Sequence, residues 1–171
     1  MDLITRINRT RFLGREFLTW LWYRADKQEG IFHHGDQTIE VWFDARMTLE
    51  GQGEIKEQSV IKSETPTATD EARAALQSGK YVSEARLRLI SDQKQWTVTV
   101  KGDELSLGTL KIPALLTSEE DDRVEERCYL MEEVEDILDD LFAQFIHLRL
   151  GDDAWKEEVQ DIREWVFSDT A

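Results

Sequence analysis

Apolar residues recur at helical spacing near the start of the chain. The intervals between Leu3, Ile4, Ile7, Leu13, Phe17, Trp20 and Leu21 predict a helix over residues 3–27. We expect Gly14 to bend or divide this helix. Residues 28–37, which include Gly30 and Gly35, predict a loop.

A longer apolar stripe runs through the C-terminal part of the chain. Its members, three or four residues apart, are Val124, Cys128, Met131, Val134, Leu138, Leu141, Phe145 and Leu148. This spacing predicts a long helix with one packed seam, in which Cys128 is a buried structural thiol. Ser118 followed by Asp121 resembles a capping box at its start, and Gly151 is expected to end it. An amphipathic helix with Trp155, Val159, Ile162 and Val166 follows.

The middle of the chain alternates between apolar and polar positions, as strands do. Residues 39–43 and 47–49 predict two short strands, and residues 54–62 predict a third. Further strands are predicted at 81–89, 96–100 and 105–112. A short helix near 70–78, capped by Thr67 or Thr69 and ended by Gly79, precedes them.

These elements predict one α+β domain over residues 1–171. An antiparallel sheet is packed by an N-terminal aromatic helix and a long C-terminal helix. Residues 1–27 form the helical lead-in, residues 38–112 the β-rich core and residues 119–168 the C-terminal helices.

Charge is distributed unevenly along the 171 residues, whose net charge is −15. Residues 1–27 hold six basic and three acidic side chains, whereas residues 119–140 hold twelve acids and two arginines. The overall charge disfavours nonspecific attraction to nucleic acid or anionic lipid. For the acids at 119–140 a solvated helix face is the favoured interpretation, and a metal or acid–base site is the alternative.

No catalytic or cofactor motif is present. The sequence lacks GxSxG, the P-loop and GxGxxG. His33 and His34, with Asp36 close by, form a small polar cluster, but adjacent histidines rarely bind the same metal ion and no further ligand is obvious. We therefore expect a non-enzymatic protein without a cofactor or metal. The single cysteine, Cys128, fits a reducing cytoplasm, and neither a signal peptide nor a membrane span is expected.

The basic, aromatic segment 6–27 has two interpretations. In one, its aromatic residues pack onto the sheet and its arginines pair with the protein's own acids; this core packing is favoured. In the other, it meets a ligand or partner. Eight large apolar residues between Phe12 and Tyr23 exceed what one helix stripe buries. The phosphate candidates are Arg6, Arg9, Arg11 and Arg15, and the candidates for a partner surface are Phe12, Trp22 and Tyr23.

From Leu18 to Trp155 the order of sequence segments resembles the C-terminal half of the recombination-associated protein RdgC family. The segments that carry the resemblance are LTWLW, EVWFDARMTLEG, EIKEQSVIK, GKYV followed by SEARLRLISD, QKQWTVTVKGDELSLGTLKIP and EVEDILDDLFAQFIHL.

This resemblance implies a ring-forming dimer that encircles double-stranded DNA and modulates RecA-dependent recombination. The family's N-terminal half is missing, so the implied partner is a protein resembling that half, or a second copy of this chain. The family's lysine-rich segment reads VIKSETP here, where only Lys62 is basic and Glu64 repels phosphate. Lys80, Arg86 and Arg88 are the other basic candidates near the implied DNA path.

Three functional hypotheses follow. The favoured one is a non-enzymatic subunit of an RdgC-like assembly on double-stranded DNA, in the cytoplasm or at the nucleoid, acting mainly through protein–protein contacts. The alternative is an acidic DNA mimic that binds a basic DNA-binding protein. A metal-dependent hydrolase is the least favoured.

Overall fold

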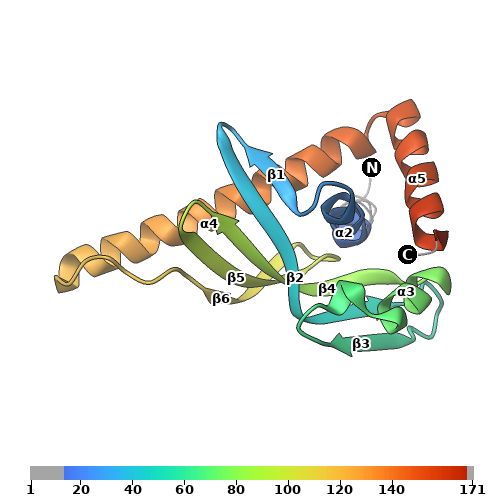
Figure 1. Cartoon of the computed structure of the whole chain (residues 1–171), viewed down its shortest axis with the longest axis horizontal. Coiled ribbons are helices and arrows are strands. Elements are labelled where there is room, and N and C mark those ends of the chain that lie inside the picture. The colour runs from blue at the N-terminus through green and yellow to red at the C-terminus, as the bar shows by residue number, and fades with distance from the viewer. Residues whose placement is uncertain (1–13, 169–171) are drawn as a thin grey trace, which may run out of the picture.

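The computed structural model describes residues 14–168, which form an antiparallel sheet and four α-helices (Figure 1). The helices are α2 (Phe17–Lys27), α3 (Asp70–Gln77), α4 (Glu120–Arg149) and α5 (Asp152–Phe167). The strands are β1 (Ile31–His34), β2 (Gln37–Glu50), β3 (Gln58–Lys62), β4 (Tyr81–Ser91), β5 (Lys94–Lys101) and β6 (Ser106–Lys111). The predicted α+β class is confirmed. Residues 3–13 of the predicted N-terminal helix lie outside the described residues.

The long strand β2 organises the sheet. The strand order is β1-β2-β4-β5-β6, and β3 pairs with the second half of β2, on the side where β1 pairs with the first half. The prediction of two short strands is wrong, because residues 37–50 form one strand with an irregularity between Phe43 and Met47. Ala45 has a φ of 54° there, which lets the strand bend without ending.

The predicted loop over residues 28–37 is also wrong, because Ile31–His34 forms strand β1. Gly30 and Gly35 both have positive φ and bracket this short strand. Because these two glycines are typical of turns, the sequence predicts a loop for the whole segment, although the residues between them form a strand. His34 and Gln37 form the last pair of the β1–β2 hairpin.

One face of the sheet, which we call the inner face, is buried beneath helices. Its side chains include Val41, Phe43, Leu87, Leu89, Trp96, Val98 and Val100. The indole Nε1 of Trp96 donates a hydrogen bond to the carbonyl oxygen of Leu130 on α4 (2.9 Å). The ring of Trp22 on α2 lies 6.4 Å from that of Phe43. Helices α2 and α4 thus cover the same face.

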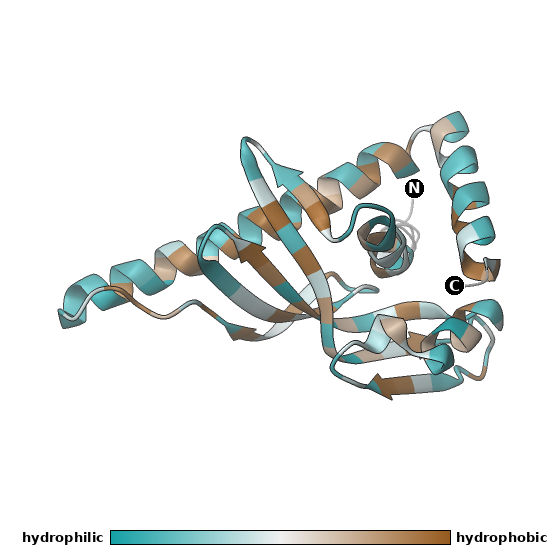
Figure 2. Ribbon diagram, viewed as in Figure 1, coloured by the Kyte–Doolittle hydropathy of each residue, from teal (hydrophilic) through white to brown (hydrophobic). Residues whose placement is uncertain are grey.

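Helix α2 is buried on nearly all sides. Phe17, Leu18, Trp20, Leu21, Trp22 and Tyr23 are all buried. Helix α5 packs over α2, and Trp165 makes edge-on ring contacts with Trp22 (5.2 Å) and Tyr23 (5.6 Å). The first two turns of α2 are apolar on nearly every side, which suits such an interior position, whereas Asp26 and Lys27 at its end are exposed. Figure 2 shows the same concentration of hydrophobic residues on α2 and on the strands near it.

The capping residues predicted from the sequence are found at α3 but not at α4. The Thr69 hydroxyl accepts a hydrogen bond from the Ala72 N–H and caps α3, as predicted, and Gly79 follows that helix with a φ of +89°. The predicted capping box of α4 is wrong. Its N-cap is Glu119, and no side chain bonds there.

Candidate functional site

Helix α4 divides into a packed half and a projecting half. Val134, Leu138, Leu141 and Phe145 are buried, as the periodicity predicts. The preceding members of the same stripe are not. The N-terminal part of α4 reaches beyond the sheet (Figure 1), and at Met131 the helix turns the adjacent Leu130 towards the core instead. The exposed fractions of Val124 and Met131 are 58% and 45%, and Cys128 is exposed. The prediction that Cys128 is buried is therefore wrong.

We call Val124, Cys128 and Met131 the exposed stripe. Residues three or four apart on a helix share a face, so these three side chains form one apolar strip. The strip lies beside the buried seam, which begins at Leu130. Most residues around it are acidic, which agrees with the largely hydrophilic ribbon of this end of α4 in Figure 2. The surface thus combines apolar positions with a strong negative charge.

The chain before α4 is tied against the projecting half. The Glu126 carboxylate accepts hydrogen bonds from the Leu116 N–H (2.7 Å), the Thr117 N–H (3.1 Å) and the Thr117 hydroxyl (2.7 Å). These donors lower the pKa of Glu126. They hold the backbone in place while the Leu116 side chain is exposed.

An ion pair marks the place where α4 leaves the sheet. Lys94 Nζ on β5 donates to both carboxylate oxygens of Glu133 (2.9 and 2.8 Å), which raises the pKa of Lys94. The same ammonium lies 5.5 Å from the centre of the Tyr129 ring. Lys94 therefore contacts α4 at both residues, close to the edge of the packed half.

The second surface is the face of the sheet opposite the inner face, which we call the outer face. Trp42, Arg88, Thr97 and Lys111 are cross-strand neighbours in one row over β2, β4, β5 and β6. Arg86 pairs with Thr99 in the next row. The structure thus brings together two of the predicted phosphate candidates, Arg86 and Arg88, beside the 40% exposed Trp42.

The other phosphate candidates are placed differently. Lys62 is exposed and lies opposite Arg46 in the β2–β3 pair. Lys80 Nζ donates to the Ser59 hydroxyl (2.8 Å). Arg6, Arg9 and Arg11, like the partner candidate Phe12, lie outside the described residues.

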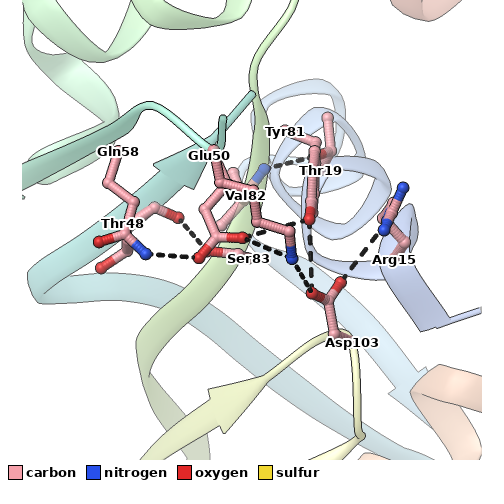
Figure 3. A network of polar contacts seen from close by, with 10 residues as sticks. Arg15, Thr19, Thr48, Glu50, Gln58, Tyr81, Val82, Ser83 and Asp103 are labelled. Atoms are coloured by element: carbon pink, nitrogen blue, oxygen red, sulfur yellow. Dashed lines mark hydrogen bonds and ion pairs between the residues drawn. The ribbon is translucent and has the colours of Figure 1, made fainter. Parts of the chain in front are cut away.

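Arg15 belongs to a polar network where β4 begins (Figure 3). Its Nε lies 3.8 Å from an Asp103 carboxylate oxygen, and its guanidinium sits 5.2 Å from the Tyr81 ring centre. The Tyr81 hydroxyl lies 3.3 Å from Glu50 and 3.4 Å from Asp103. Burial and these carboxylates raise the pKa of Tyr81 to about 12. The hydroxyl is therefore protonated at neutral pH, and the network ties the strands to the start of α2.

The predicted partner surface at Trp22 and Tyr23 is wrong. Trp165 of α5 covers both side chains, and Trp22 also lies against Phe43 of the sheet; their exposed fractions are 0% and 4%. Trp165 lies more than a hundred residues further along the chain. The helical spacing of α2 could therefore not predict this contact.

The histidines do not form a metal site. His34 Nδ1 lies 3.2 Å from Asp140, and residues 14–168 contain no group of three or more histidine, cysteine or acidic side chains placed to hold a metal ion. The helices in this part of the chain also lack the combination of length and apolar content needed to span a bilayer.

No protein-family model, curated protein or solved structure matches this chain. The two candidate surfaces of this chain are the projecting half of α4 and the outer face of the sheet.

Proposed function

We propose that this chain is a non-enzymatic subunit of an RdgC-like assembly on double-stranded DNA, and that it acts mainly through protein–protein contacts. The observation that carries the proposal is the exposed stripe of Val124, Cys128 and Met131 on a helix that projects beyond its own domain. Apolar positions of this kind are typical of the core of a protein–protein interface.

The charge around the exposed stripe favours a basic partner over a second copy. Residues 119–133 hold eight acids and two arginines, so two copies would bring like charges together. A partner of the RdgC N-terminal type would supply the complementary charge. It would also supply most of the phosphate contacts, since affinity for DNA grows with the number of phosphates neutralised.

The test is reconstitution with a purified basic chain of the RdgC N-terminal type. We expect the two chains to associate at low salt and to retard duplex DNA together. Val124→Asp should weaken association about tenfold or more, because it places a carboxylate in the apolar centre of the contact. Ile55→Asp is the matched control, since Ile55 is 86% exposed and lies far from α4 in the sequence. Absence of association, or equal binding by both variants, rejects the proposal.

A second function is supported by the carboxylates of α4. Glu120, Asp121, Asp122, Glu125, Glu132, Glu135, Asp136 and Asp139 are all exposed along the helix. Such a row can imitate the phosphates of DNA and occupy the basic groove of a DNA-binding protein. Adding duplex DNA to the complex with the basic protein distinguishes the two functions. DNA would bind to a complex of subunits, but it would displace a mimic from the basic groove. Neutralising these acids should weaken binding to a basic partner in either case, so the effect of duplex DNA is the outcome that decides between the two functions.

A further inference from the structure

The outer face carries a fixed aromatic plane. Trp42 Nε1 donates a hydrogen bond to Glu40 Oε2 (3.1 Å), which restrains the indole. Gly30, with a φ of +77°, lies against the ring, and a Cβ at that position would come within 3.1 Å of Trp42 Cζ2. The ring is nevertheless 40% exposed. An aromatic side chain held in this way is ready to stack without first losing conformational freedom.

Six basic residues share the face of the sheet that carries this ring, and Arg88 is its direct cross-strand neighbour. Arg46, Lys62, Arg86, Arg88, Lys101 and Lys111 lie on the outer face, and none forms an ion pair within the part of the chain that the structure describes. On the helical side, by contrast, Arg24, Arg73, Lys94 and Arg149 all pair with carboxylates. Six cations without an ion pair thus share one face of a protein whose net charge is −15. The described helices hold further cations without an ion pair, namely Lys27, Arg123, Arg127 and Arg163.

Two of these cations lack acceptors. The Nε atoms of Arg86 and Arg88 are buried, and neither has a hydrogen-bond partner among residues 14–168. A buried donor without an acceptor is costly. Because the two Nε atoms are shielded, a phosphate would bind the terminal nitrogens of these half-buried side chains, for which phosphate oxygens are strong acceptors. Towards β3 the same face is hollowed by a groove of about 310 Å³. Its lining includes Arg46 and Lys101 together with the acids Glu50, Glu84, Asp103 and Glu104, so the groove itself is not basic.

We propose that the outer face binds single-stranded nucleic acid directly. One base stacks on Trp42, and the neighbouring phosphates bind Arg88 and Arg86. A stacking plane favours a single strand, because the base faces of a duplex are already stacked on one another. Glu40, Asp44 and Glu84 lie on the same face and confine the site to a few nucleotides. This activity needs no partner chain and goes beyond the proposed assembly.

The test uses the whole chain and a fluorescent oligothymidylate of about twelve nucleotides, with anisotropy read at low salt. We expect Trp42→Ala to weaken binding about tenfold, and Trp42→Phe to retain most of it because phenylalanine still stacks. Arg88→Gln should weaken binding and make the slope of log affinity against log salt shallower by about 0.7, the value for one phosphate contact. Tyr129→Ala is the control, since Tyr129 is an exposed aromatic residue on α4.

Two further ligands identify the class of nucleic acid that the outer face binds. Oligouridylate of the same length shows whether the strand is DNA or RNA, and a duplex of the same length tests the preference for unpaired bases. The inference is overturned by failure of both single strands to bind, by tighter binding of the duplex, or by an unchanged affinity in folded Trp42→Ala. Because the basic partner is absent, these outcomes are independent of those that test the assembly.

Discussion

At the scale of single residues, Glu158 joins α5 to α2. This buried carboxylate accepts hydrogen bonds from Trp20 Nε1 (2.9 Å), Arg24 Nε (2.6 Å) and Arg24 Nη2 (2.8 Å). Glu158→Ala leaves the indole N–H and the guanidinium without this acceptor, so we expect a loss of about 2 to 3 kcal/mol in the free energy of unfolding. Urea unfolding measures it. Glu157→Ala, at an exposed neighbour, should cost under about 0.5 kcal/mol; equal losses contradict the role of Glu158.

Tyr81 gives the protein a specific response to alkaline pH. Its pKa is about 12 in the folded chain and 10.0 in the reference state. Between these values the unfolded chain loses the phenolic proton first, so stability falls as pH rises, by about 2 to 3 kcal/mol in all. Tyr81→Phe should remove this part of the decline, and ultraviolet titration should lose its highest phenol transition. A decline with the same slope in Tyr81→Phe would contradict the assignment; Tyr129→Phe is the control.

At the scale of elements, α4 is one helix with two environments. Val134 and Val124 belong to the same stripe, but Val134 is fully buried and Val124 is 58% exposed. Val134→Ala should lower the free energy of unfolding by roughly 1 to 3 kcal/mol, because it removes buried methyl groups and leaves a cavity. Val124→Ala should change it by less than about 0.5 kcal/mol. Chemical denaturation of this matched pair tests the division, and similar losses would show that the exposed stripe is packed.

Periodicity predicted the elements better than it predicted their surroundings. The steps of three and four residues in α4 identify the helix, but they continue unchanged where the sheet ends, so they could not show that Cys128 is exposed. Strand β1 was not predicted, because its four residues are too few to show a clear alternation and lie between two turns. Arg86 and Arg88 were found as basic positions on one strand. Trp42 became part of the same surface only when the register placed it opposite Arg88.

At the scale of the whole molecule, charge and packing are separated in space. The acids concentrate on the projecting half of α4, whereas six cations without an ion pair lie on the outer face of the sheet. A local basic surface can act within a strongly acidic protein, because salt screens charges more than about 8 Å apart at physiological ionic strength. The two proposed binding surfaces are therefore compatible within one chain.

A single core connects the sheet to α2, α4 and α5, so these parts should unfold together. The buried cluster runs without a break from Phe17 on α2 through the inner face to Trp165 and Val166 on α5. We expect tryptophan fluorescence, which reports mainly on Trp20, Trp22, Trp96 and Trp165, and far-ultraviolet circular dichroism to give one urea midpoint. Only the projecting turns of α4 should open earlier, with faster amide exchange over residues 120–129 than over 134–148, because few buried contacts hold them. Two separate midpoints would divide the chain into independent units and would contradict the single-domain prediction.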